Sequence, residues 1–281
     1  MRLRRRRNLL QVFAGGVAFA TVTPATAAST VPIALLHLAP RPGEIAANRR
    51  ALEQAVRRAA ANSARLIVTP ELAVSGYGFR DLIGTGWIAS GQSALFAWAG
   101  ALARETGASL VLGTPEAAQD KDALHNSMVL FAPDGSVVGR HRKVNALRVG
   151  SESWSTPGDR SSVFAIEGIG HVGFFVCADM YSPRLVDETA ARDVDLLLSS
   201  AAWAPGLHGP DGEWERASAT TGQPVLVCNR TGRDVLDFDA ARSVAAIDGA
   251  IAFSHASREP GIVLIDWTPA TRRLANWRVV R

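Results

Sequence analysis

The stretch "FFVCADMYSPRLV", residues 174–186, joins an apolar run to a polar turn that contains proline, with Cys177 at the junction. A continuous apolar run of this kind is typical of a strand that is covered on both faces. A cysteine at its end is either a small buried side chain or a nucleophile held at the tip of the strand. Helix-like segments and further apolar runs alternate on both sides of it, which predicts an α/β fold.

The alternation can be followed through the chain from residue 31 onward. Strands are expected where short apolar or β-branched runs occur, and helices where apolar residues recur with helical spacing. An Asp134-Gly135 pair between two such runs predicts a hairpin. The expected strands are 33–38, 65–70, 108–113, 126–133, 136–143, 171–177, 194–200 and 224–229, with at least two more in 243–267; the expected helices are 44–63, 93–107, 183–193 and 212–221. No linker-like or repeated segment divides the chain, so we expect one domain over residues 31–281.

Length and composition favour a single globular core. The chain has 281 residues, of which 47% are hydrophobic and 20% are charged. Its net charge of +4 comes from five arginines near the N-terminus, and without them the chain has 25 basic and 26 acidic residues. Because the basic charge belongs to that segment, nucleic-acid binding is not expected.

Residues 1–28 have the pattern of an export signal: a basic start, an apolar segment from Leu9 to Ala20, and an Ala25-Thr26-Ala27 cleavage motif. The apolar segment is too short to span a bilayer, so no membrane span is expected after its removal. The sequence "RRRNLLQ" resembles the twin-arginine export consensus, with an ordinary secretory signal as the alternative. We therefore expect an exported protein, periplasmic or secreted.

Several common site types find no support. The six histidines and two cysteines have no zinc-ligand spacing, so no metal is expected. The motif "GIGHVG", residues 168–173, matches a dinucleotide fingerprint, but a strand-like run follows it where a helix is required. It therefore predicts a turn between strands, and no cofactor. Cys177 and Cys228 are able to form one disulfide, though nothing demands it. A pairing of His141 or His171 with Cys177, as in thiol proteases, remains an alternative.

Three apolar or β-like runs each deliver a reactive residue to their end. These residues are Glu71, Lys143 and Cys177. Functional groups converge at the carboxyl ends of strands in helix-covered sheets. A carboxylate, an ammonium and a thiol that meet there form a site for acyl transfer.

The three segments resemble the signature blocks of the nitrilase superfamily, the carbon-nitrogen hydrolases with a Glu-Lys-Cys site. The blocks are "PELAVSGYGFRDL" (70–82), "HRKVNAL" (141–147) and "CADMYSP" (177–183). Further agreement comes from "LLLSSAAW" (196–203), "VLVCNRTG" (225–232) and "SVAAIDGAI" (243–251). The resemblance implies a four-layer α-β-β-α sandwich and a homodimer or larger homo-oligomer.

The resemblance also implies roles. Cys177 is the expected nucleophile, Glu71 the base, and Lys143 a positive charge that favours the thiolate and stabilises negative oxygen. The backbone N–H of Ala178 follows the nucleophile and is the second expected oxyanion donor.

The resemblance offers further candidates for the site. Glu152 is offered as the second active-site glutamate, although its spacing to Pro157 is about one residue short, and an ordinary loop glutamate is the alternative. Tyr77 and Trp203 are candidates for lining the substrate cleft, with plain packing as the alternative, and the Gly- and Pro-rich loop 203–212 is a candidate rim.

Departures from the family pattern narrow the expected function. Nitrile-hydrolysing members carry tryptophan and glutamate after the cysteine, whereas this chain has Ala178 and Asp179. Thr220-Thr221 stands where many amidases of the family have Glu-Asn, which leaves that local support in doubt. We expect a hydrolase that cleaves a small carboxamide or N-carbamoyl compound through a cysteine thioester, releasing ammonia or an amine. The alternatives are a nitrilase, an acyltransferase and a catalytically silent binding protein.

Overall fold

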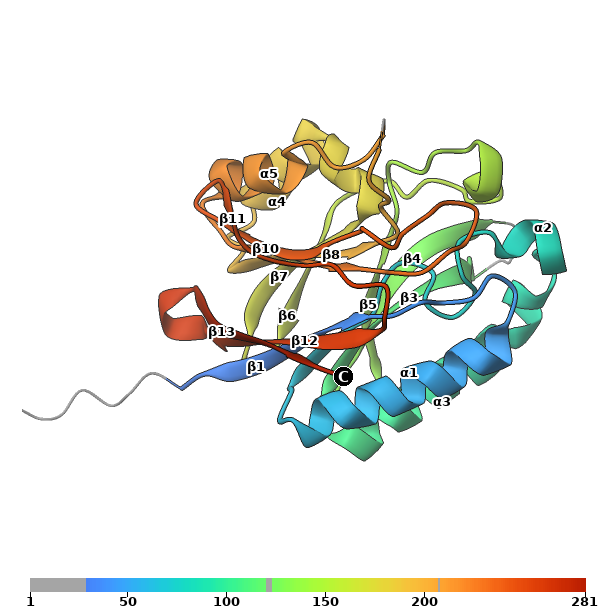
Figure 1. Cartoon of the computed structure of the whole chain (residues 1–281), viewed down its shortest axis with the longest axis horizontal. Coiled ribbons are helices and arrows are strands. Elements are labelled where there is room, and N and C mark those ends of the chain that lie inside the picture. Colours follow the sequence, from blue (N-terminus) through green and yellow to red (C-terminus); the bar gives the residue numbers. More distant parts are fainter. Residues whose placement is uncertain (1–28, 120–122, 207) are drawn as a thin grey trace, which may run out of the picture.

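The fold consists of two sheets packed face to face with helices on both outer sides (Figure 1). A computed structural model describes residues 29–119, 123–206 and 208–281. Helices α1 (Ile45–Ala61) and α3 (Trp87–Thr106) cover one sheet, and α4 (Pro183–Ala190) and α5 (Glu213–Thr221) cover the other. A short helix, α2 (Phe79–Ile83), precedes α3. The expected α-β-β-α sandwich is therefore confirmed.

The first sheet has seven strands in the order β13-β12-β1-β2-β3-β4-β5. Neighbours β1, β2 and β3 are parallel, and all other pairs are antiparallel. The strands are β1 (Val31–His37), β2 (Leu66–Val68), β3 (Ser109–Ala117), β4 (Leu124–Phe131), β5 (Val137–Arg142), β12 (Gly261–Thr268) and β13 (Arg273–Val280).

The second sheet has six strands in the order β11-β10-β9-β8-β7-β6. It also has a parallel centre, formed by β7, β8 and β9. The strands are β6 (Ser162–Ile166), β7 (Gly170–Val176), β8 (Leu196–Ala201), β9 (Val225–Asn229), β10 (Ser243–Ile247) and β11 (Ala250–His255).

The apolar runs of the sequence are buried on both faces. In β1, Ile33 and Leu35 pack into the core between the sheets, whereas Ala34 and Leu36 pack on the opposite face with residues of α1 and α3. Successive side chains of a strand point to opposite faces, so a strand in the middle of four layers needs apolar residues at every position. This is why these strands show no polar alternation.

The "GIGHVG" motif lies in a hairpin. Strand β6 pairs antiparallel with β7 through a turn in which Gly168 has φ of +72°. No helix opens after the motif, so the expected turn between strands is confirmed. The C-terminal stretch 243–267 contains β10, β11 and β12, which confirms the expectation of at least two strands.

The predicted export signal, residues 1–28, lies outside the described residues. Within the described part of the chain, no helix is both long and apolar enough to cross a membrane.

Candidate active site

Glu71, Lys143 and Cys177 each follow the end of a strand. Glu71 comes three residues after β2, Lys143 directly follows β5, and Cys177 directly follows β7. The side chains of Glu71 and Lys143 meet between the two sheets: the Lys143 Nζ lies 2.9 Å from the Glu71 Oε1. The sequence therefore predicted a real convergence of distant segments.

Glu152 completes the group. It lies in the short 3-10 helix Gly150–Glu152, and its Oε2 accepts a hydrogen bond of 2.8 Å from the Lys143 Nζ. All three side chains are buried. The reading of Glu152 as an ordinary loop glutamate is thus not supported, because an exposed loop residue would not be held against a buried ammonium.

Asn126 joins the two carboxylates and was missed at the sequence level. Its Nδ2 donates 2.7 Å to the Glu71 Oε1 and 2.9 Å to the Glu152 Oε1. The other Glu71 oxygen, Oε2, accepts 2.8 Å from the backbone N–H of Ala202. The only signal in the sequence was an asparagine at the start of an apolar run. A polar side chain on a buried strand normally has a hydrogen-bond partner.

Gly113 of β3 lets the Glu71 segment approach the sheet. A Cβ atom at this position would lie 2.2 Å from the Pro70 carbonyl oxygen and 3.0 Å from the Glu71 Cα. Both are backbone atoms, which cannot rotate aside. A glycine inside a strand marks such a close approach of another backbone, and here it fixes where the Glu71 carboxylate lies.

Cys177 occupies a strained turn. Its φ is +45°, in the left-handed region of backbone conformations that residues other than glycine rarely adopt. Strain of this kind costs on the order of 1–3 kcal/mol and clusters at functional sites. The turn ends β7 and starts the 3-10 helix Cys177–Tyr181, so the thiol leaves the line of the strand.

The charges around Cys177 are unevenly balanced. Burial disfavours a charged Lys143, but Glu71 and Glu152 outweigh it and hold the pKa of Lys143 well above its ordinary value. Burial also raises the pKa of Cys177, Glu71 raises it further, and Lys143 opposes both without reversing the result. Lys143 therefore acts in the expected direction, because its charge lowers the pKa of Cys177, but burial and the two carboxylates outweigh it and the pKa of the thiol lies above its ordinary value.

Burial likewise raises the pKa of Glu152, against the opposing charge of Lys143. Lys143 therefore offsets part of the rise that burial and Glu71 cause in the pKa of Glu152.

Cys177 opens onto a cavity of about 520 Å³. The cavity wall includes all three residues predicted to contact substrate, Tyr77, Ala178 and Trp203. Four residues of the predicted rim loop also line it: Ala204, Pro205, His208 and Gly209. Leu147, Val149, Tyr181 and Leu236 were not expected there, because their approach depends on loops whose shape the sequence does not reveal.

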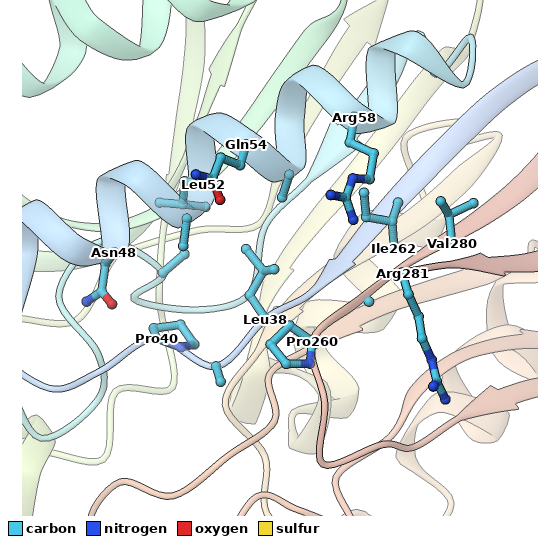
Figure 2. Close-up of a pocket in the computed structure, with 15 residues that line it drawn as sticks. Leu38, Pro40, Asn48, Leu52, Gln54, Arg58, Pro260, Ile262, Val280 and Arg281 are labelled. Carbon is cyan, nitrogen blue, oxygen red and sulfur yellow. The ribbon is translucent and has the colours of Figure 1, made fainter.

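A second hollow, of about 260 Å³, lies between α1 and the residues around β12 and β13 (Figure 2). Its buried polar side chain, Asn48, already bonds to the backbone of Arg41 and Val74. The other side chains labelled there are mainly apolar, and the two arginines among them, Arg58 and Arg281, are exposed. No residue of the Cys177 group lines this hollow, so we place the candidate site at the first cavity.

Asp179 braces the cysteine turn against the lysine segment. Its Oδ1 accepts backbone hydrogen bonds of 2.9 and 2.8 Å from Val144 and Asn145, and its Oδ2 accepts 2.8 Å from Val176. The His141 Nε2 lies 2.8 Å from the same Oδ2. One ring nitrogen of His141 is thus hydrogen-bonded to Asp179, and the other is hydrogen-bonded to Ser162. Exposed His171 lies near the far end of β7, so the thiol-protease pairing is not supported.

Substitution of Asp179 by asparagine is expected to lower the free energy of unfolding by about 2–4 kcal/mol at pH 7, since buried charged hydrogen bonds are broken. Although burial opposes it, the bonds from His141 and the backbone lower the pKa of Asp179. Its contribution is therefore present above the ordinary pKa of 3.8 and lost as the pH falls through the lower folded value. Urea unfolding of both proteins should show their difference shrinking below about pH 4. An unchanged difference at pH 3 would contradict this role.

Cys228 is structural. Its side chain is fully buried in the inner core, and the Sγ donates to the carbonyl oxygens of Leu36 and Val68 at 3.4 and 3.2 Å. Both cysteines are free, so the possible disulfide does not form in this structure.

Within residues 29–119, 123–206 and 208–281, no cluster of three or more His, Cys, Asp or Glu is arranged to hold a metal ion.

Comparisons with known proteins bear on the family and the fold. Residues 32–274 match the model of the carbon-nitrogen hydrolase family. A nitrilase of Pyrococcus abyssi is 30% identical over 175 residues, which are 61% of this chain and 64% of that protein. A citrullinase of Francisella tularensis is 26% identical over 74% of this chain and 77% of its own length. The solved structure of an amidase of the nitrilase superfamily from Nesterenkonia AN1 superimposes with a TM-score of 0.75 at 24% identity, covering 88% of this chain and 94% of the amidase.

Proposed function

This chain belongs to the carbon-nitrogen hydrolase family, and we propose that it hydrolyses a small linear amide or N-carbamoyl compound through a thioester on Cys177. The single observation that carries the proposal is the buried Glu71-Lys143-Glu152 group at the turn that holds Cys177 over the cavity. A silent binding protein would have no need to keep two carboxylates and an ammonium buried together, since such a group is costly to desolvate.

The first step forms the thioester. The Cys177 Sγ attacks the substrate carbonyl carbon while its proton passes to the Glu71 carboxylate, because the raised pKa of the thiol leaves little thiolate at rest. Negative charge develops on the carbonyl oxygen. The Lys143 ammonium and the backbone N–H of Ala178 are the proposed donors to it, and each such donor is typically worth on the order of 3 kcal/mol.

The second half releases the products. Glu71 returns its proton to the amide nitrogen, the carbon–nitrogen bond breaks, and ammonia or an amine leaves. Glu71 then removes a proton from water, and the water oxygen attacks the thioester carbonyl. As the carbon–sulfur bond breaks, Glu71 returns this proton to the sulfur, which frees the carboxylic acid and the thiol. Glu152 and Asn126 serve as positioning residues, since they hold Lys143 charged and fix the Glu71 carboxylate.

We also propose that the protein is exported, on the pattern of residues 1–28. N-terminal sequencing of protein recovered from the cell envelope tests this, with cleavage after Ala27 as the expected result.

The homodimer implied by family resemblance is likewise a proposal, which sedimentation of the purified chain tests.

Alkylation by iodoacetamide tests the proposed nucleophile. We expect label on Cys177, which faces the cavity, well before Cys228, which is fully buried. The rate of amide hydrolysis should fall in proportion to the label on Cys177. An excess of substrate should slow both the labelling and the loss of activity. Because the pKa of Cys177 is raised, the labelling rate should still be rising between pH 7 and pH 9. Full activity after complete labelling of Cys177 would remove the proposal, and Cys228→Ala, labelled in parallel, serves as the control.

A further inference from the structure

We propose that the acyl part of the substrate is uncharged and apolar, and is a ring or a chain of about six carbons. The inference rests on the proposed amide hydrolysis and adds the class of substrate to it. It is carried by the wall of the Cys177 cavity, by the hydrogen bonds that its aromatic side chains already make, and by the partners of the nearby cations.

The wall is apolar over most of its area. Beside Cys177 it is formed chiefly by Tyr77, Leu147, Val149, Tyr181, Trp203 and Leu236, with His208 and small residues between them. Among the described residues, no Lys, Arg, Asp or Glu side chain lines this cavity. Apolar surface buried from water contributes about 25 cal/mol per Å², so a hydrocarbon acyl group gains from entering it.

The polar tips of the aromatic side chains are already engaged. The Trp203 Nε1 donates 2.9 Å to the His208 carbonyl oxygen, and the Tyr181 hydroxyl donates 2.7 Å to the same atom. The Tyr77 hydroxyl donates 3.4 Å to the Glu152 Oε2. These three side chains therefore offer ring surface to a ligand, and their donors stay on the protein.

Trp203 is also held rigidly. Its ring packs edge to face against Tyr181 and Trp214, with centroids 4.8 and 5.6 Å apart. Its backbone N–H donates to the Asn229 Oδ1, and its carbonyl accepts from the Asn229 Nδ2. A ring fixed on both its backbone and its edge forms a preorganised wall, which lowers the entropy lost on binding.

The cations near the site have partners. Lys143 lies between Glu71 and Glu152, and the fully buried Arg230 pairs with Asp234 at 2.6 Å. Arg148 lies between two lining residues in the chain, but it is exposed and does not line the cavity. A carboxylate or zwitterion on the acyl chain would therefore lose its hydration without gaining a lysine or arginine counter-ion, and His208 is the only histidine among the described residues of the wall.

The size of the cavity favours an acyl group larger than acetyl. Ligand pockets of about 300–1,000 Å³ bury most of a drug-sized molecule, and this one is about 520 Å³. Acetamide would leave most of the wall in contact with water. A six-carbon chain or a benzene ring covers far more of it.

A matched pair of amides tests the inference. Hexanamide and adipic acid monoamide have the same chain, and differ in a terminal methyl or carboxylate. We expect the kcat/KM of the purified protein for hexanamide to exceed that for the monoamide by about 100-fold or more. Citrulline should be as poor a substrate as the monoamide. Trp203→Ala should lower the kcat/KM for hexanamide about 10- to 100-fold more than it lowers that for acetamide.

A charge placed on the wall gives the converse result. Leu236→Arg should raise the ratio of monoamide to hexanamide turnover about tenfold or more, because it supplies the missing counter-ion. Val235→Arg is the control: Val235 is equally exposed, at 50%, and does not line the cavity, so the ratio should not change.

Two outcomes overturn the inference in different ways. If the monoamide is hydrolysed as well as hexanamide, and this needs Cys177, the cavity does not select apolar acyl groups, while the proposed hydrolysis stands. Loss of that activity in Arg148→Ala would then identify the cation. If no amide is hydrolysed in a reaction that needs Cys177, the proposed function falls and the inference with it.

Discussion

Replacement of Cys177 by alanine leaves a folded protein that hydrolyses amides about 10⁴- to 10⁶-fold more slowly than the native chain, the size of effect seen when other covalent enzymes lose their nucleophile. The substitution removes the only thiol that faces the cavity of about 520 Å³ in the described structure. Alanine fits the turn with little change in volume. Ammonia release with hexanamide measures the activity, and thermal unfolding measures the fold.

Cys228→Ala is the matched control. It also removes one buried thiol, but from the core between the sheets, where the Sγ only donates to two carbonyl oxygens. We expect it to lower the free energy of unfolding by about 1 kcal/mol and to leave kcat within a few-fold. Hydrolysis by Cys177→Ala at a tenth of the native rate would show that another group is the nucleophile.

Replacement of Lys143 by methionine is expected to affect both stability and turnover. Methionine keeps an unbranched side chain that ends one atom short of the lysine Nζ, and it leaves Glu71 and Glu152 buried without a cation. Breaking a buried charge group in this way costs about 3–5 kcal/mol of unfolding free energy. Loss of one oxyanion donor should lower kcat about 10²- to 10³-fold at the same time.

The stability of Lys143→Met should depend on pH in a defined direction. Burial already raises the pKa of Glu152, and removal of the opposing ammonium raises it further. When the pKa of a carboxyl is raised in the folded state, the folded state is not penalised at a pH below the ordinary pKa of 4.5. As the pH rises through the folded pKa, the carboxyl must ionise while buried, and the protein loses that part of its free energy of unfolding. Urea unfolding should therefore show a larger deficit against the native chain at pH 8 than at pH 5.

Arg160→Met controls for the loss of a positive charge. Arg160 pairs with Asp159 at 2.7 Å, but both side chains are about 70% exposed. An exposed ion pair contributes about 0–1 kcal/mol, so little change is expected. A deficit for Lys143→Met that is equally small, or that is larger at pH 5 than at pH 8, would contradict the buried charge group.

Much of the fold was predictable because strands at the centre of the two sheets had to be apolar at every position. The continuous runs of β1, β7 and β8 indicated strands covered on both faces, and the structure confirms them. The order of the strands was different: the pairing of β1 with β12 near the other end of the chain has no local signal. Family resemblance, not periodicity, supplied the four layers.

The candidate site was predictable where a reactive residue followed a strand. Glu71, Lys143 and Cys177 share that pattern, and Glu152 was found despite its unusual spacing. Asn126 and the bracing role of Asp179 were missed, since each acts through contacts with distant backbone or side-chain groups. The net rise in the pKa of Cys177 was not predicted, because it depends on burial and on charges from three separate segments.

Partitioning of the acyl group between water and hydroxylamine tests the central claim most directly. The native protein is incubated with hexanamide or with methyl hexanoate in the same hydroxylamine concentration, and hexanoic acid and its hydroxamate are measured. If both donors form one thioester on Cys177, the ratio of the two products is the same for the amide and the ester, and Cys177→Ala yields neither. A ratio that differs between the two donors, or hydroxamate formed by Cys177→Ala, would contradict a shared acyl-enzyme at this cysteine.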